Sequence, residues 1–319
     1  MGRILILDSE IVKKLAVELG ADLVGIVKPE PLASEAVDLE KWLNLGYHGE
    51  MLWMMKNREF RNDPAKLLPD CKSIVMIGVN YFTPHSHLRT ENFPKISRYA
   101  WGCDYHEVLR SILKKLADEL KALVKENGEP APKFRIAVDS APFREKVWAQ
   151  RAGIGWIGKN SLIITREFGS WIFLGALLTD IGIHPVQAES HPNHCGKCAK
   201  CIDSCPTSAL RHPGRINANQ CLSYLTVEHD GAIPNRFPDR LNGWIFGCDI
   251  CQNVCPWNRF SKKARLPDFS PRQELLIPDL HFLSTMEEEE FNRITLGTPI
   301  HRSGRERLRR NALAVMDLL

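Results

Sequence analysis

The chain has 319 residues, of which 44% are hydrophobic and 25% are charged, and its formal net charge is +4. This length and composition predict a globular protein with a sizeable core and room for more than one domain. No run of eighteen apolar residues occurs, which excludes a membrane-spanning helix, and the charged N-terminal segment predicts neither a secretory nor a twin-arginine leader. A charge of +4 is too small to indicate a nucleic-acid partner by itself.

Helical and strand periodicities alternate along the first 180 residues. The expected helices cover residues 9–19, 33–45, 105–127 and 143–152. The expected strands cover residues 23–27, 72–81, 134–138, 162–165 and 171–178. Ser9 and Asp104 are placed to cap the first and third helices. This alternation predicts an α/β-type N-terminal domain, which we assign to residues 1–188.

Eight of the ten cysteines form a doubled motif. Cys-x2-Cys-x2-Cys-x3-Cys-Pro begins at Cys195, and an incomplete copy, Cys-x2-Cys-x3-Cys-Pro, begins at Cys248. The first spacing is that of bacterial two-cluster ferredoxins, in which the fourth cysteine binds the other [4Fe–4S] cluster. We assign the first cluster to Cys195, Cys198, Cys201 and Cys255. We assign the second cluster to Cys205, Cys221, Cys248 and Cys251.

Two other interpretations of the cysteines are weaker. Zinc needs only four ligands and leaves the repeated x3-Cys-Pro ending unexplained. A disulfide framework needs an oxidising compartment, of which the sequence gives no sign. We therefore expect a ferredoxin-like dicluster domain over residues 189–260, in a protein of the cytoplasm.

The N-terminal domain is expected to hold what the clusters reduce. Asp139 follows a predicted strand, a position from which side chains commonly reach a substrate, although it is equally suited to cap a helix. The glycines of AGIGWIGKN would let the backbone approach a bulky ligand, but they precede a strand and do not fit the dinucleotide fingerprint. Tyr105 is compatible with a buried ring and His106 with an ordinary helix start.

Four segments together resemble epoxyqueuosine reductase, and the resemblance runs over almost the whole chain. They are SRYAWGCDYHEVL at 97–109, VDSAPFREKVWAQRAGIGWIGKNSLIIT at 138–165, CGKCAKCIDSCPTSAL at 195–210 and GCDICQNVCPWN at 247–258. The resemblance implies two [4Fe–4S] clusters and a cobalamin, with a fold similar to that of reductive dehalogenases. It also implies the last step of queuosine biosynthesis, in which cob(I)alamin fed by the clusters reduces epoxyqueuosine at the wobble position of tRNA to the alkene and water.

The same resemblance implies roles for individual residues. Asp139 is similar to the family's proton donor and Tyr105 to a nearby active-site tyrosine. The positions similar to those that line the cobalamin pocket are Arg61, Ser97, Asp139, Ile163, Leu174, Ser223, Cys248 and Asp249. Epoxide opening needs a proton source, and we expect the apolar neighbours of Asp139 to raise its pKa for that purpose.

Residues 261–319 are expected to form a short helical segment that resembles a truncated HEAT-like repeat. Arg302, Arg305 and Arg309 are predicted to contact tRNA, although a solvated helix face explains them as well. Because a solenoid repeat needs neighbours, this helix must pack on the core or belong to a shortened chain. The overall class expected is α+β.

The expected partners are the anticodon stem-loop of tRNA and an external electron donor such as a flavodoxin or ferredoxin system, with no membrane and a monomeric state. Two alternatives remain at this point. One is a reductive dehalogenase-like cobalamin enzyme that acts on a small molecule, and the other is a ferredoxin-like electron carrier without catalysis. The large N-terminal domain argues against a carrier.

Overall fold

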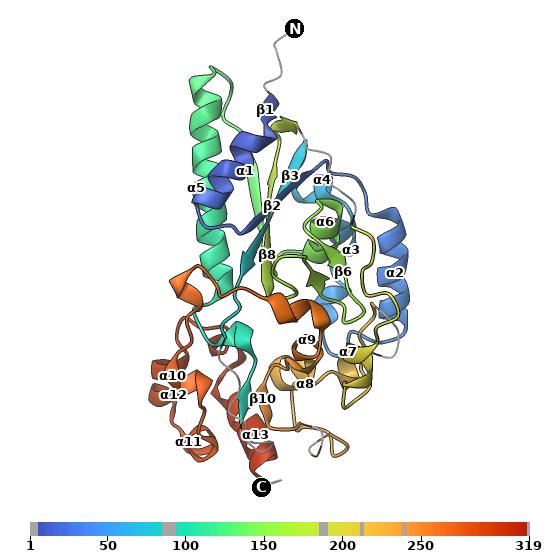
Figure 1. Cartoon of the computed structure of the whole chain (residues 1–319), viewed down its shortest axis with the longest axis vertical. Coiled ribbons are helices and arrows are strands. Elements are labelled where there is room, and N and C mark those ends of the chain that lie inside the picture. Colours follow the sequence, from blue (N-terminus) through green and yellow to red (C-terminus); the bar gives the residue numbers. More distant parts are fainter. Residues whose placement is uncertain are drawn as a thin grey trace.

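A four-stranded antiparallel sheet lies at the centre of the N-terminal half, in the order β2-β3-β8-β5 (Figure 1). The computed structural model describes residues 6–84, 94–184, 191–210, 214–237, 239 and 241–317. The strands are β2 (Leu23–Val27), β3 (Ser73–Asn80), β5 (Phe134–Ala137) and β8 (Ile172–Thr179). β3 pairs with β8 along its whole length, and all eight of its residues are buried. Since both faces of β3 are covered, its sequence is apolar almost throughout.

Helices cover the two faces of this sheet. On one face lie α1 (Ser9–Glu18) and α5 (Tyr105–Glu126), which pack against Val75, Ile77 and Val79 of β3. On the other face lies α6 (Glu145–Arg151), which packs against Ile74 and Met76. Side chains of β3 thus alternate between two hydrophobic cores, as the pleat of a strand requires.

The remaining elements of the N-terminal half are short, apart from α2 (Ala33–Asn44). They are α3 (Arg58–Asn62), α4 (Pro64–Leu67), β6 (Trp156–Ile157) and β7 (Ile163–Ile164). β1 (Ile6–Asp8) pairs in parallel with β9 (Gly182–His184). Turns of 3-10 helix occur at Leu52–Met54, Arg98–Ala100, Ala218–Gln220, Pro256–Phe260, Pro267–Phe269 and His301–Ser303.

The expected α+β class is confirmed, while two local expectations need revision. The central strands run antiparallel, although alternation of strands and helices is typical of a parallel sheet. Asp8, not Ser9, caps α1, because its carboxylate accepts a bond from the Glu10 backbone N–H at 2.8 Å. Asp104 caps α5 as predicted, and it accepts from the His106 N–H at 3.0 Å.

The cysteine-rich part contains α7 (Lys200–Asp203), α8 (Leu222–Val227) and α9 (Ile250–Asn253). Its strand β10 (Trp244–Phe246) pairs in parallel with β4 (Lys95–Ile96), which comes from the N-terminal half of the chain. The expected boundary at residues 188 and 189 lies outside the described residues.

Four helices follow the cysteines: α10 (Gln273–Leu276), α11 (Leu280–Thr285), α12 (Glu288–Thr295) and α13 (Arg305–Met316). α13 packs on α11, β10 and α8 through Leu308, Ala312 and Val315. Of the two outcomes expected for this helix, packing on the core is the one observed.

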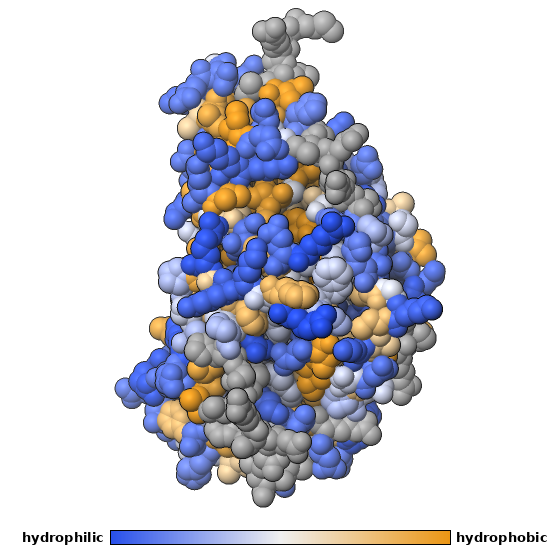
Figure 2. Space-filling model, in the orientation of Figure 1, coloured by the Kyte–Doolittle hydropathy of each residue, from blue (hydrophilic) through white to orange (hydrophobic). Residues whose placement is uncertain are grey.

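Figure 2 shows charged and polar residues interspersed with smaller hydrophobic patches on the face it presents. None of the helices within the described residues is long and apolar enough to cross a membrane.

Candidate active site

Asp139 lies in the turn after β5, beside the first turn of α5. Its Oδ2 atom accepts a hydrogen bond from the Tyr105 hydroxyl at 2.9 Å and lies 3.1 Å from Nε2 of His106. The backbone of Asp139 is left-handed, with φ at 49°, a conformation that costs a non-glycine residue about 1 kcal/mol or more. α6 begins only at Glu145, so Asp139 does not cap it. The turn is strained, and two side chains of α5 hold its carboxylate.

His106 lies between two carboxylates. Its Nδ1 is 2.7 Å from Oδ1 of Asp104 and its Nε2 is 3.1 Å from Oδ2 of Asp139, and only 9% of the side chain is exposed. Burial opposes the charged ring, but the hydrogen bonds and charges of the two carboxylates outweigh it and raise the pKa of His106 to about 9. His106 therefore does more than begin the helix, because its Nε2 also contacts the Asp139 carboxylate. Its pairing with Asp104 could be predicted from the helix cap, because the two residues are close in sequence. Its contact with Asp139, 33 residues away, could not be predicted from neighbouring residues.

The pKa expected for Asp139 is wrong in direction. Burial by itself favours the neutral acid, but hydrogen bonds from His106 and Tyr105, the His106 charge and the Arg302 charge outweigh it. They hold the pKa of Asp139 below its usual range, although the side chain keeps 54% of its surface exposed. In this arrangement the carboxylate is ionised, and both the Tyr105 hydroxyl and Nε2 of His106 lie within hydrogen-bonding distance of its Oδ2.

Tyr105 is a neutral hydrogen-bond donor to this carboxylate. Its ring stacks on Phe173 at 4.4 Å between centroids and on His106 at 4.1 Å. Burial and the Asp139 charge raise the pKa of Tyr105 well above its usual range. The hydroxyl therefore keeps its proton, and its position is fixed by the stacked rings.

Several buried polar atoms of the N-terminal half have no hydrogen-bond partner among the described residues. They include Trp148 Nε1, Asn160 Nδ2 and Ser161 Oγ, and also Arg61 Nε and Glu145 Oε1, whose groups lie close enough to Asp139 for the charges to act on one another. Glu145 accepts from the Asp139 backbone N–H, and burial together with the Asp139 charge raises the pKa of Glu145 to about 8. Unsatisfied buried polar atoms are costly, so Arg61 and Glu145 are candidate contacts of a ligand that carries donors and acceptors. The amide-rich rim of a corrin would fit this set.

The other positions expected to line a cobalamin pocket lie in two places. Asp249 is fully buried and accepts from the Ser97 hydroxyl and, at 2.9 Å, from the Arg98 backbone N–H. Ile163 lies in β7 and is buried, and Leu174 lies in β8 and packs against the same core. Ser223 lies in α8, near the cysteines. Ser97 and Asp249 are thus already bonded to each other.

The glycines at 153–158 serve the packing of the chain on itself rather than approach to a ligand. A Cβ atom at Gly155 would lie 2.1 Å from the Ile164 carbonyl oxygen, and one at Gly158 would lie 2.4 Å from Cδ1 of Ile164. Only Gly153 among them has a positive φ, at 74°. Their predicted role in ligand approach is therefore replaced by close contact with β7.

The eight cysteines of the motif form two adjacent groups. The first group, whose thiolate charges act on one another, comprises Cys195, Cys198, Cys201 and Cys255. The second group comprises Cys205, Cys221, Cys248 and Cys251. Within each expected ligand set the thiols act on one another electrostatically, although Cys201 of the first set also acts on Cys251 of the second. No group of three or more His, Cys, Asp or Glu side chains in the described part of the chain is arranged to hold a single metal ion, so the ligand sets stay a prediction. Burial and mutual repulsion raise the pKa of the Cys248 and Cys251 thiols, so thiolates here need bound cations, as iron–sulfur clusters provide.

A lysine ties the first group to the N-terminal half. Lys159, in the turn between β6 and β7, donates to the Gly196 carbonyl at 2.7 Å and to the Cys198 carbonyl at 2.9 Å. The indole rings of Trp156 and Trp257 meet edge to face beside Cys195. Cys71 lies far from this motif in the sequence, and burial raises the pKa of its thiol to about 11, as expected for an inert cysteine.

The arginines predicted to contact tRNA all have partners within the protein. Arg302 donates to Glu228 at 2.9 Å, Arg305 to the Met286 carbonyl at 3.1 Å, and Arg309 to the Ser284 carbonyl at 2.8 Å. Arg305 also pairs with three glutamates and is mostly buried, whereas Arg302 and Arg309 keep 51% and 46% of their side chains exposed.

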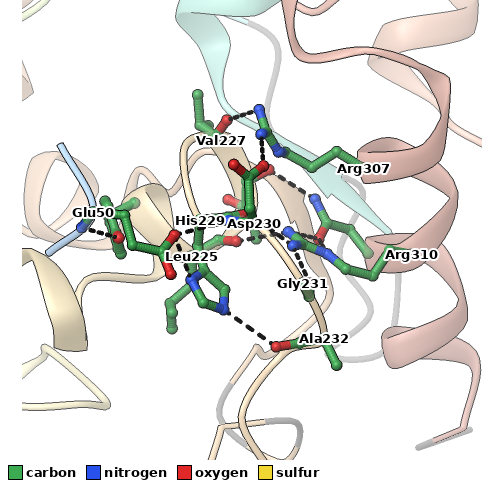
Figure 3. A network of polar contacts seen from close by, with 12 residues as sticks. Glu50, Leu225, Val227, His229, Asp230, Gly231, Ala232, Arg307 and Arg310 are labelled. Atoms are coloured by element: carbon green, nitrogen blue, oxygen red, sulfur yellow. Dashed lines mark hydrogen bonds and ion pairs between the residues drawn. The ribbon is translucent and has the colours of Figure 1, made fainter. Parts of the chain in front are cut away.

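Two neighbouring arginines of α13 are wholly structural (Figure 3). Arg307 donates to the Val227 carbonyl and to Asp230, and Arg310 donates to the carbonyls of Leu225, His229 and Gly231. They bind the loop after α8 from one side, while Glu50 binds its His229 from the other. Much of the basic character of this segment therefore serves to hold that loop.

Two family models match the chain. One is described as a 4Fe-4S double cluster binding domain and matches residues 194–258, and the other is described as epoxyqueuosine reductase QueG, DUF1730 and matches residues 61–140. The chain is 44% identical over 309 residues to the epoxyqueuosine reductase of Vibrio cholerae, with 96% of this chain and 82% of the relative covered. It is 39% identical over 310 residues to that of Atelocyanobacterium thalassa, with 96% and 98% covered.

Solved structures agree with these relatives. An epoxyqueuosine reductase crystallised with an epoxyqueuosine-modified tRNA-Tyr stem loop superimposes with a TM-score of 0.87 at 32% identity, covering 96% of this chain and 80% of that one. The Bacillus subtilis enzyme superimposes with a TM-score of 0.86 at 31% identity and the same coverage, in a structure whose catalytic aspartate loop is swung out of the active site. The dehalogenase-like and electron-carrier alternatives have no comparable support. By sequence and by fold, the chain belongs to the epoxyqueuosine reductase family.

Proposed function

We propose that this protein reduces epoxyqueuosine to queuosine at the wobble position of tRNA, with Asp139 as the acid at the epoxide oxygen. The observation that carries the proposal is the Asp139 carboxylate, held by Tyr105 and His106 near Arg61 and Glu145, each of which buries an unpaired polar atom. The family membership supplies the substrate class, because a relative binds a modified stem loop of this kind.

The reaction fixes what the site must deliver. Conversion of an epoxide to an alkene and water consumes two electrons and two protons. The electrons come singly through the two [4Fe–4S] clusters, for which we propose the ligand sets already given. The protons must reach one oxygen atom, and a positioned side chain typically accelerates such a transfer by about 10²–10⁴-fold.

Cobalamin fits the set of unpaired atoms, and we propose that Arg61, Asn160 and Ser161 bind its amide groups. We propose that Ile163 and Leu174 offer apolar contact, and that Cys248 and Asp249 lie on the side of the second cluster. When bound, cobalamin supplies a cobalt centre that accepts electrons from the clusters and reduces the epoxide carbon.

The protein's own residues do the acid–base work. Tyr105 fixes Oδ2 of Asp139 and Glu145 fixes its backbone N–H, so the carboxyl group is held in one orientation for the substrate. The stacked rings of Tyr105 and Phe173 keep the base of this site apolar. These contacts orient the acid before the substrate arrives.

For the remaining partners, we propose that the anticodon stem-loop lies against the exposed faces of Arg302 and Arg309. Arg302 is near enough to Asp139 for its charge to act on that carboxylate, so it would contact RNA close to the modified base. We further propose a cytoplasmic monomer that receives electrons from a flavodoxin or ferredoxin system. Its three functional parts span residues 1–188, 189–260 and 261–319.

The test is turnover by Asp139→Asn after anaerobic reconstitution with iron, sulfide and cobalamin. We expect the variant to retain both clusters and cobalamin but to lose at least about 100-fold in the rate at which a stem-loop carrying epoxyqueuosine loses one oxygen, measured by mass spectrometry. Asp118→Asn, an exposed position on α5, is the matched control and should behave like the parent protein. Full activity of Asp139→Asn would remove Asp139 from the acid role, and an inactive, fully loaded parent would refute the function.

A further inference from the structure

The site contains a second acid–base group that the proposed role of Asp139 does not use. Each turnover consumes two protons at one oxygen, whereas a single carboxyl group holds one. Asp139 must therefore be reprotonated within the cycle. The question is which group supplies that proton, and the answer rests on the function proposed above.

The hydrogen-bond geometry locates a proton on His106. A neutral imidazole has one N–H and one acceptor nitrogen, but both ring nitrogens of His106 lie within 3.1 Å of carboxylate oxygens. Carboxylates accept and do not donate, so both contacts are satisfied only if the ring carries two protons or one carboxyl group is protonated. In either case the triad of Asp104, His106 and Asp139 holds one proton more than two ionised carboxylates and a neutral ring.

The surroundings leave this proton few ways out. The His106 ring is stacked on Tyr105, and 9% of the side chain is exposed. Asp104 is the less accessible partner, with 23% of its side chain exposed against 54% for Asp139, and it also caps α5. His106 can therefore exchange its proton with solvent and with substrate through Asp139, while Asp104 holds the other ring nitrogen.

Other charged groups act on the triad from neighbouring elements. Arg302, from the turn after α12, lowers the pKa of both Asp104 and Asp139. Glu145, from α6, contacts the Asp139 backbone. Tyr105 shares Oδ2 of Asp139 with His106 but keeps its proton. His106 is thus the member of the cluster whose ring lies directly between two carboxylates.

We propose that His106 is the proton reservoir of this active site and that Asp104 holds it in place for that task. In the first transfer, the Nε2–H bond of His106 breaks, an O–H bond forms at Oδ2 of Asp139, and Asp139 passes a proton to the epoxide oxygen. His106 is then neutral, with its remaining proton on Nδ1 toward Asp104. A solvent proton that reaches the exposed Asp139 carboxylate passes to the vacant Nε2 and restores the imidazolium, and a second transfer from Nε2 through Asp139 delivers the proton that completes water. The two electrons are those that the clusters supply in the established activity of the family.

His106 acts through Asp139, so it is a positioning and proton-supplying residue, and the test must separate this role from a merely structural one. Two variants serve this purpose. His106→Gln keeps a donor beside Asp139 but cannot store a proton. Asp104→Asn keeps the helix cap, since asparagine caps as well as aspartate, but removes the charge that holds the imidazolium.

The first measurement is the pH profile of turnover with the fully loaded protein, a reduced viologen as electron donor and a stem-loop carrying epoxyqueuosine. We expect the parent to stay active up to about pH 9, where His106 loses its proton. His106→Gln should lose at least about tenfold in kcat near neutral pH, with little change in KM, and should regain rate as the pH falls and Asp139 itself becomes protonated. A variant profile that matches the parent's, or a loss that is the same at every pH, would overturn the proposal.

The second measurement needs no substrate. In protein labelled with nitrogen-15 at histidine, the His106 signal is identified by its absence in His106→Gln, and its titration is followed by NMR. We expect the His106 ring to titrate well above the usual histidine range. In Asp104→Asn its acid dissociation constant should be at least tenfold larger. Titration near the unperturbed value in the parent would overturn the proposal, even if the stem-loop assay succeeds. Conversely, an inactive parent protein in which His106 titrates well above the usual histidine range would refute the proposed substrate and not this inference.

Discussion

Replacement of Asn311 by leucine tests how α13 is attached to the cluster-bearing part of the protein. Asn311 is fully buried, and its Nδ2 donates to the carbonyls of Thr226 and Ile245, both at 2.8 Å. Its Oδ1 accepts from Arg310. Leucine has a similar volume and favours helix, so the change removes hydrogen bonds with little effect on packing or propensity.

The expected loss follows from the groups left behind. Each buried carbonyl without a donor costs about 1–3 kcal/mol, and the apolar side chain returns about 1–2 kcal/mol. We expect a net loss of about 2–4 kcal/mol in the free energy of unfolding. With an unfolding entropy of about 2.1 cal/mol/K per residue, that corresponds to a fall of about 3–6 °C in Tm for this chain.

Anaerobic thermal unfolding followed by circular dichroism measures this effect, with cluster absorption recorded in parallel. Leu313→Ala is the matched control on the same helix, because Leu313 is 38% exposed and its loss should cost under about 1 kcal/mol. A Tm for Asn311→Leu within 1–2 °C of the parent, about what a sub-1 kcal/mol change produces, would show that these two hydrogen bonds do not anchor α13 and would refute the reasoning.

Three further outcomes are expected. Gly155→Ala should lower the free energy of unfolding by about 3 kcal/mol or more, because its Cβ would meet a carbonyl of β7. Gly128→Ala, which lies in open space at φ 73°, should cost about 1 kcal/mol. Equal losses of the two variants in urea unfolding would contradict the packing argument. The raised pKa of His106 contributes to the free energy of unfolding below pH 6.5, and this contribution is lost as the pH rises through about 9. The difference in the free energy of unfolding between the parent and His106→Gln should therefore shrink by up to about 3 kcal/mol across that range. A difference that grows with pH would contradict this expectation. Arg309→Ala should lower the slope of log Kd against log salt for the stem-loop by about 0.7–0.9, with Lys114→Ala on α5 as the control, and an unchanged slope would place the RNA elsewhere.

The sequence predicted those features that depend on residues close to one another along the chain. The spacing from Cys195 to Cys205 predicts which thiolates share a cluster, and the thiols of each expected set lie close enough for their charges to act on one another. The Asp104 cap and the buried strand β3 were likewise predicted, since a cap and an apolar run depend on adjacent residues. Motif resemblance supplied the family and drew attention to Asp139.

What the sequence could not provide depends on contacts between distant residues. The antiparallel direction of the central strands is decided by pairing across the sheet and not by any one strand. The pKa of Asp139 was expected from its apolar neighbours in sequence, but it is set by His106, which lies across the site. Likewise, the need for glycine at position 155 becomes apparent only when β7 is seen to pack against it. In each case the deciding partner is more than eight residues away along the chain.

The bond between Ser97 and Asp249 has a consequence for how iron enters the protein. It joins residues 152 positions apart, next to a proposed cluster ligand and beside the parallel pair β4–β10. The bond ties the segment that carries Cys248 to the N-terminal half of the chain, so the iron content is expected to report on whether these two parts have come together.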